Sequence, residues 1–174
     1  MYNVCESVTI LKCKGFTPIR QPEDHSVKER LHQKEKPHME NCIFCKIVAG
    51  QIPSATVYED DDFKAIMDIA PAAKGHVIIL AKRHMPNLLE IEEKTASRAL
   101  LVASKIANAQ KKALGCDGIN MLQNNGSAAW QSVFHLHIHL IPRYEGDGVT
   151  MPWKELSYAD GEAAEYAKKI AAEL

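Results

Sequence analysis

The sequence predicts an α+β domain with a mainly antiparallel five-stranded sheet, one long helix and one C-terminal helix. Five short segments are rich in β-branched residues or alternate between apolar and polar residues, as strands do. Only one long internal segment has helical periodicity, and neither a glycine-rich phosphate loop nor a dinucleotide-binding fingerprint occurs. Several short strands around one long helix favour an antiparallel sheet.

The strand candidates are bounded by turn residues. Gly75–Ala81 is a β-branched run that we expect to be buried, and Ser132–Ile141 is the clearest strand, with Pro142 expected to end it. The other three candidates are Ala55–Glu59, Phe63–Asp68 and Ile119–Gln123.

Three helices are predicted. A short turn over Cys42–Ala49 is followed by Gly50, and the longest helix covers Ile91–Leu114 and is followed by Gly115. The third helix lies in the Ala/Glu/Lys-rich tail Asp160–Leu174. The apolar stripe of the long helix is expected to contain Leu100, Ala103, Ile106, Ala107, Ala113 and Leu114, with Gln110 as its one polar member.

The chain divides into a predicted flexible extension, residues 1–38, and a compact domain, residues 39–174. The stretch Arg20–His38 is rich in charged residues and has no helical stripe, so it can bury little apolar surface. Met39 stands where the compact part begins and is a candidate for the true start.

Composition is that of an ordinary globular protein, with 46% hydrophobic residues, 25% charged residues and a net charge of -1. This charge gives no indication of a nucleic-acid partner, and no apolar run approaches the roughly 18 residues of a membrane span. We therefore expect a cytoplasmic protein that binds neither nucleic acid nor membrane. The five cysteines, an odd number, argue against a disulfide framework, so Cys42 and Cys45 indicate metal binding or redox chemistry.

Three histidines alternate with aliphatic residues in the last strand candidate. Because a strand has a period of two residues, His135, His137 and His139 are expected to share one face, roughly 6.6 Å apart in sequence order. One metal ion could bind two neighbours but hardly all three, because a Zn–N bond is only about 2.0–2.1 Å long. At least one histidine is therefore available for other chemistry.

Three interpretations of these histidines remain open. They can be ordinary structural side chains, or a His-x-His metal-hydrolase or cupin site, although such sites usually add a carboxylate soon after the pair. The next acids, Glu145 and Asp147, follow Pro142. Alternatively, a neutral histidine can attack phosphorus and form a phosphohistidine.

The run Gln131–Arg143 resembles the signature of the histidine triad (HIT) family. The segments Cys42–Ile47, Ile52–Ala55, Asp68–Ile69 and Gly75–Ile79, running on to His84, are similar to its bacterial nucleoside-phosphoramidase-like (Hint-type) members. The resemblance extends from Asn41 to the C-terminus and implies a HIT-like fold for residues 39–174.

The resemblance also implies roles for particular residues. His137 corresponds to the nucleophile, His139 to a phosphate contact, Ser132 to a hydrogen-bonding group near the leaving group, and His76 to a group that assists proton transfer. Asp68 corresponds to the acid that binds the ribose hydroxyls. The other implied nucleotide contacts are Asn124 at the phosphate and Ile43, Phe44, Ile47, Ile66 and Ile69 around the base.

A structural zinc ion is implied by the same resemblance. Cys42, Cys45, His84 and His135 form a Cys2His2 set, which structural zinc sites commonly use. The redox alternative would require a thioredoxin-like βαβ context, which the sequence lacks. One residue departs from the family pattern, because Trp130 stands where the family usually has a glycine.

The activity implied is a nucleotide hydrolase or nucleotidyl transferase that cleaves purine nucleoside phosphoramidates through a nucleotidyl-phosphohistidine. Dinucleoside polyphosphate hydrolysis in the same site is an alternative, and a nucleotide-binding regulatory protein with vestigial activity is another. The family usually forms a homodimer that pairs the long helices, and Ile91–Leu114 could supply such a surface.

Overall fold

The structure is a computed structural model that describes residues 41–150 and 155–174. The predicted flexible extension, residues 1–38, and the candidate start at Met39 lie outside the described residues. Within the described residues no helix is long and apolar enough to cross a membrane.

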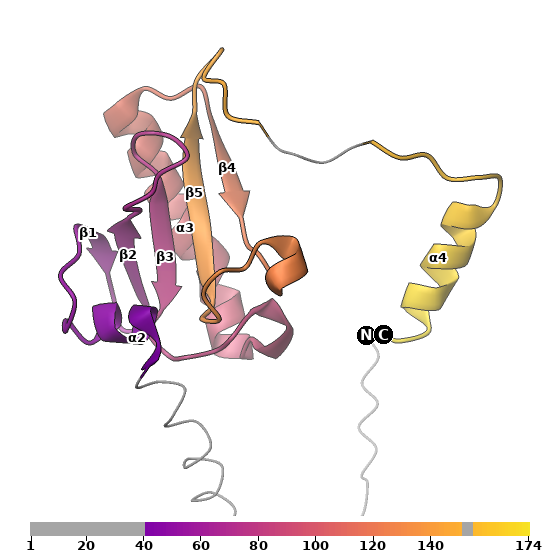
Figure 1. The fold of residues 1–174 in the computed structure, drawn as a ribbon, viewed down its shortest axis with the longest axis horizontal. Coiled ribbons are helices and arrows are strands. Elements are labelled where there is room, and N and C mark those ends of the chain that lie inside the picture. Colours follow the sequence, from indigo (N-terminus) through magenta and orange to yellow (C-terminus); the bar gives the residue numbers. More distant parts are fainter. Residues whose placement is uncertain (1–40, 151–154) are drawn as a thin grey trace, which may run out of the picture. The chain divides into compact units, whose positions relative to one another are not determined.

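Five antiparallel strands form one sheet in the order β1-β2-β3-β5-β4, which confirms the predicted fold class (Figure 1). The last strand in sequence, β5, therefore lies inside the sheet, between β3 and β4. The strands are β1 (Thr56–Glu59), β2 (Phe63–Met67), β3 (Val77–Ala81), β4 (Gly118–Leu122) and β5 (His137–Arg143).

The long helix α3 (Glu93–Leu114) packs against one face of this sheet. Its buried stripe is Thr95, Ala99, Val102, Ala103, Ile106 and Gln110. The stripe expected from the sequence was partly wrong, because Leu100, Ala113 and Leu114 are exposed. Leu100 lies next to the buried Ala99 in sequence, and a step of one residue turns a side chain about 100° around a helix.

The buried side chain of Gln110 connects three elements of the fold. Gln110 Nε2 donates hydrogen bonds to the carbonyl oxygens of Gly75, at 2.8 Å, and Leu140, at 3.1 Å. It thereby connects α3 to β5 and to the turn before β3, so a buried polar side chain takes part in positioning the sheet.

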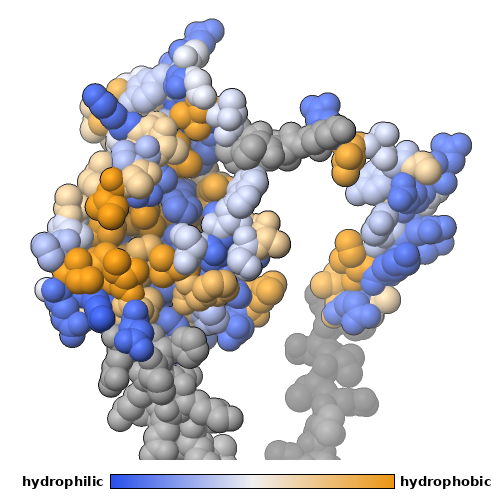
Figure 2. All heavy atoms as spheres, in the orientation of Figure 1, coloured by the Kyte–Doolittle hydropathy of each residue, from blue (hydrophilic) through white to orange (hydrophobic). Residues whose placement is uncertain are grey.

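The opposite face is covered in part by the short helix α2 (Ile43–Val48). Ile47 of α2 packs on Ile66, Ile78 and Leu80 of the sheet, with Phe44 against the same cluster. Figure 2 shows apolar side chains gathered over α2 on this face. Within residues 41–150, α2 therefore covers only part of this second face.

The strand β5 differs from its prediction at both ends. It begins at His137 rather than Ser132, and it continues through Pro142 to Arg143. Proline is tolerated there because pairing with β3 ends at Leu140, so the missing N–H of Pro142 breaks no ladder on that side. On the other side Pro142 still pairs with Ile119.

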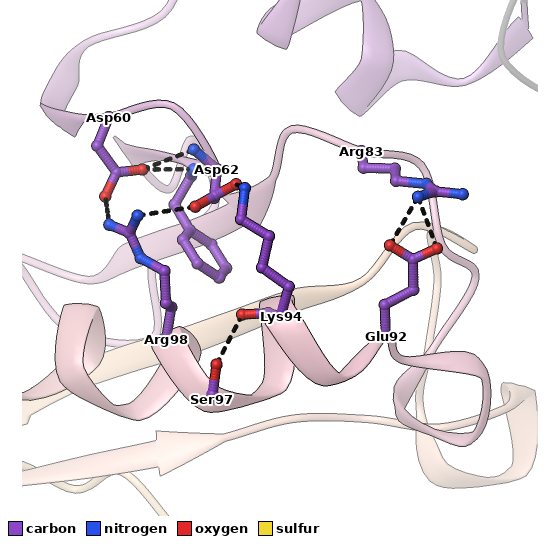
Figure 3. Close-up of polar contacts among 8 residues, drawn as sticks. Asp60, Asp62, Arg83, Glu92, Lys94, Ser97 and Arg98 are labelled. Atoms are coloured by element: carbon purple, nitrogen blue, oxygen red, sulfur yellow. Dashed lines mark hydrogen bonds and ion pairs between the residues drawn. The ribbon is translucent and has the colours of Figure 1, made fainter. Parts of the chain in front are cut away.

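A network of charged side chains ties the β1–β2 turn to the start of α3 (Figure 3). Arg98 contacts Asp60 at 2.6 Å and Asp62 at 2.8 Å, and Lys94 contacts Asp62 at 2.7 Å. Asp60 also accepts the backbone N–H groups of Asp62 and Phe63, so the turn is held by its own first acid. The C-terminal helix α4 (Glu162–Ala171) is confirmed within the predicted tail.

Candidate active site and adjoining cysteine–histidine cluster

Two of the three histidines lie on the sheet face that carries α2. His137 and His139 pair across the sheet with Leu80 and Ile78, whose side chains pack under α2, and their ring centroids are 5.0 Å apart. His135 lies outside the strand, because it precedes β5 and its N–H bonds to the carbonyl of Val133 in a bend. Its ring is nevertheless on the α2 side with that of His137, since Phe44 packs edge-on against both, with centroid separations of 5.9 and 5.1 Å.

The position of the proton on His137 follows from its neighbour. Nδ1 of His137 is 2.6 Å from the carbonyl oxygen of His135, which can only accept, so Nδ1 carries the proton. Burial lowers the pKa of His137, opposed by this hydrogen bond and by the charge of Asp68. The neutral ring therefore has its lone pair on Nε2, and Phe44 packs against it with a centroid separation of 5.1 Å.

A second chain of hydrogen bonds orders His76 and His139. The N–H of Ala72 donates to His76 Nδ1 at 3.2 Å, so His76 carries its proton on Nε2, which lies 2.9 Å from His139 Nδ1. His139 then keeps its proton on Nε2. Burial, followed by the nearby His137 and His76, lowers the pKa of His139 to about 4. Asp68 lies beside the pair, with Oδ2 3.4 Å from His76 Nδ1.

The loop after β4 approaches the same face. β4 ends at Leu122, which pairs with His139, so the loop that carries Asn124 leaves the sheet beside the histidine strand. Gln131 holds the loop in shape: its Nε2 donates to the carbonyl of Pro86 at 2.6 Å, and its Oε1 accepts the N–H of Gly126 at 2.8 Å. Sequence reasoning assigned no role to Gln131, and its place inside the quoted motif was the available signal.

The other residues assigned to the site are spread over different environments. Ile47 and Ile66 are buried beside Phe44 in one core cluster, and Ile43 is half-exposed. Ile69, at 99% relative exposure, stands outside this cluster. Ser132 is exposed and lies three residues before His135.

A cluster of two cysteines and two histidines adjoins the histidine pair. Its ligand atoms all lie within 4.8 Å of one another and come from α2 and its N-cap, the segment after β3 and the bend before β5: Cys42, Cys45, His84 and His135. The Sγ–Nδ1 separations are 3.3 to 3.5 Å, and the two Nδ1 atoms are 3.2 Å apart. A tetrahedral zinc ion would place sulfur and nitrogen ligands about 3.5 Å apart, so the donor set fits zinc.

The protonation of the cluster also suits a cation. His135 Nε2 donates to the carbonyl of Ala81 at 2.7 Å, which leaves the lone pair of Nδ1 directed at the cysteines. Burial, and then the neighbouring Cys42, raises the pKa of Cys45 to about 12. A divalent cation would offset both the desolvation and the repulsion between thiolates.

Comparisons with known proteins identify the family. A family model described as HIT domain matches residues 49–146. Protein hit of Bacillus subtilis is 44% identical over 136 residues, which cover 78% of this chain and 92% of that protein. A crystal structure of a HIT family member from Bacillus subtilis has a TM-score of 0.73 at 43% identity, covering 77% of this chain and 97% of that one.

Further similar proteins have more specific names. Adenosine 5′-monophosphoramidase hnt1 of Schizosaccharomyces pombe is 34% identical over 77% of this chain and 98% of its own length. Adenylylsulfatase HINT3 of Arabidopsis thaliana is 44% identical over 62% of this chain and 54% of its own length. A zinc-bound histidine triad family protein from Mycobacterium smegmatis has a TM-score of 0.62 at 33% identity, covering 77% and 99% of the two chains. Together with the fold and the paired histidines, the match shows that this chain belongs to the HIT family.

Proposed function

We propose that this protein hydrolyses purine nucleoside phosphoramidates, releasing a nucleoside monophosphate and an amine, with His137 as nucleophile. The observation that carries the proposal is the hydrogen bond from His137 Nδ1 to the carbonyl of His135, which directs the lone pair of Nε2 away from the backbone. The name of the fission-yeast relative, an adenosine 5′-monophosphoramidase, supports the same chemistry.

The proposed reaction has two displacements at the α-phosphorus. The lone pair of His137 Nε2 forms a bond to phosphorus while the P–N bond of the substrate breaks, and the bonding electrons leave with the amine nitrogen. That nitrogen takes up a proton, so a neutral amine or its ammonium form departs. Water then attacks the phosphohistidine, loses a proton and restores neutral His137 with release of the monophosphate.

The neighbouring groups fit supporting roles. The Nε2–H of His139, fixed by the chain from Ala72 through His76, is a donor for a phosphate oxygen. Asn124 and Ser132 are proposed to contact the phosphate and the region of the leaving group. Asp68 is proposed to bind the ribose hydroxyls, and Phe44, Ile47 and Ile66 the base, with Ile43 and Ile69 contributing from their exposed positions.

We also propose that Cys42, Cys45, His84 and His135 hold a structural zinc ion. Four protein ligands leave no open coordination position, so the ion would stabilise the fold and take no part in bond breaking. His135 would then serve both sites, because its ring belongs to the cluster and its carbonyl oxygen accepts the proton of His137 Nδ1.

A homodimer is proposed through α3. Leu100 and Leu101 are 62% and 70% exposed on this helix, on a surface that does not face the sheet. Light scattering of the protein and of Leu101→Glu tests this assignment. A dimer that becomes a folded monomer in the variant supports it, and a monomeric unmodified protein contradicts it.

The test of the activity is release of AMP from adenosine 5′-phosphoramidate by the unmodified protein and by His137→Ala. We expect turnover that the variant loses by at least about a thousandfold, with AMP binding retained. Dinucleoside polyphosphates are assayed in parallel, because activity on them alone would favour the alternative hydrolase. Tight AMP binding without turnover of either substrate would favour the regulatory protein with vestigial activity.

A further inference from the structure

Trp130 has a backbone conformation that large side chains rarely adopt. Its φ of 65° and ψ of 21° lie in the left-handed region, and it is the one non-glycine residue with positive φ among residues 41–150 and 155–174. A side chain with a Cβ is strained there, and glycine is not. Such a strained residue persists only where its surroundings hold it, and these positions cluster at functional sites.

The surrounding loop does hold it. Trp130 follows the 3-10 helix Ser127–Ala129, and its N–H donates to the carbonyl of Ser127 at 3.0 Å. The next residue, Gln131, is buried and is anchored to Gly126 and Pro86 by its side chain. The backbone at Trp130 is therefore fixed from both sides, and substituting glycine would relieve strain without removing any of these contacts.

The backbone of Trp130 adjoins a residue proposed for the candidate site. The carbonyl of Trp130 is 3.5 Å from the side-chain amide of Asn124, and Asn124 follows by two residues Leu122, the strand partner of His139. The side chain of Trp130 is nevertheless 59% exposed, so the fold obtains little burial in return for the strain. A large, exposed, flat side chain held in this way is suited to contact a ligand.

The strand order of the sheet indicates which part of a bound nucleotide would lie near Trp130. The apolar residues proposed for the base lie on α2 and on β2, and β5 with His137 separates these elements from β4 and the Trp130 loop. A nucleotide with its base against Phe44 and its α-phosphorus at His137 would direct its other substituent toward β4. That substituent is the leaving group.

We propose that Trp130 determines leaving-group specificity by stacking on a planar aromatic moiety of the departing amine. This inference rests on the proposed function and names its substrate class: nucleoside phosphoramidates of amines that carry an aromatic ring. Aromatic pairs contribute enough for a preference of about three- to tenfold in kcat/KM over a saturated amine of similar length.

The experiment compares AMP joined to tryptamine with AMP joined to 2-cyclohexylethylamine, a saturated amine of similar length, as substrates of the unmodified protein, Trp130→Gly, Trp130→Phe and Phe134→Leu. The quantity used is the ratio of the two kcat/KM values within each protein, so a general loss of activity cancels. Phe134 is a matched control because it is a half-exposed aromatic residue in the same loop segment.

We expect the ratio to fall to near one in Trp130→Gly, to be largely kept in Trp130→Phe, and to be unchanged in Phe134→Leu. An unmodified ratio near one, or an equal ratio in Trp130→Gly, overturns the proposal. If the unmodified protein cleaves neither substrate, the proposed function fails instead. The Trp130 assignment is then decided by calorimetric affinities for non-hydrolysable tryptamine and 2-cyclohexylethylamine carbamates of adenosine, with the same ratio expected.

Discussion

Replacing Cys45 by serine removes one thiolate from the cysteine–histidine cluster and is expected to release the proposed zinc ion. Cys45 Sγ lies 3.3 Å from His84 Nδ1 and 3.5 Å from His135 Nδ1, so it is central to the donor set. A serine hydroxyl does not ionise at neutral pH and is a far weaker zinc ligand than a thiolate. Three remaining ligands would leave the metal weakly held.

The loss of stability can be estimated from linkage. A ligand that binds only the folded state stabilises it by about 2.7 kcal/mol when present at 100 times its dissociation constant. For a chain of this size, 1 kcal/mol shifts the melting temperature by roughly 2–4 °C, so Cys45→Ser should melt roughly 5–11 °C lower. Activity should also fall, because the ring of His135 is a cluster ligand and its carbonyl orients His137.

The assay is metal content by elemental analysis together with thermal unfolding, with and without a strong chelator. We expect about one zinc per chain in the unmodified protein, a lower melting temperature on chelation, and no chelator effect in Cys45→Ser. Cys116→Ala is the control, because this buried cysteine lies outside the cluster and should keep the metal. Full zinc content in Cys45→Ser, or a metal-free protein of unchanged stability, would refute the reasoning.

Three further changes test the fold and the loop. Burial raises the pKa of Asp60, but hydrogen bonds from Tyr58 and two turn amides outweigh this effect and hold the pKa below its usual range. Asp60→Ala should therefore lower the free energy of unfolding by about 1–2 kcal/mol at pH 7, measured in urea. The difference in stability between the two proteins should shrink as the pH falls through the acidic range where Asp60 becomes protonated. Gln131→Ala should cost about 2 kcal/mol and raise KM, because it frees the loop; an unchanged KM would contradict the assigned anchoring. Gly75→Ala should cost about 1–2 kcal/mol in the same unfolding assay, because φ is 95° there and its Cβ would meet Leu114.

Local patterns were sufficient to predict most of the fold. The predicted strands Gly75–Ala81 and Phe63–Asp68 are observed as Val77–Ala81 and Phe63–Met67, within two residues of their predicted limits, because both segments suit a half-buried or buried pleat. Leu100 was placed in the core because it is apolar, although the helix phase set by Val102 and Ile106 turns it outward. Which side of the helix is buried depends on how the helix packs against the sheet, and the local sequence does not contain this information.

The site was predicted in composition better than in geometry. The alternation Val133–His139 reads as one continuous strand, yet the bend at His135 separates a cluster ligand from the two histidines of the site. His76 Nε2 contacts His139, 63 residues away, and the side chain that holds the loop contacts Pro86, 45 residues away. Contacts of this kind depend on long-range folding, so no local pattern contains them.

The central claim is that His137 becomes covalently attached to the nucleotide. The direct measurement is mass spectrometry of the protein quenched in base during turnover of adenosine 5′-phosphoramidate, since phosphohistidine is acid-labile. The account predicts an adenylyl group on the peptide containing His137, absent when His137→Ala is used and lost when the reaction is chased. A turning-over enzyme whose His137→Ala variant retains activity, or an adenylyl group on another residue, would contradict it.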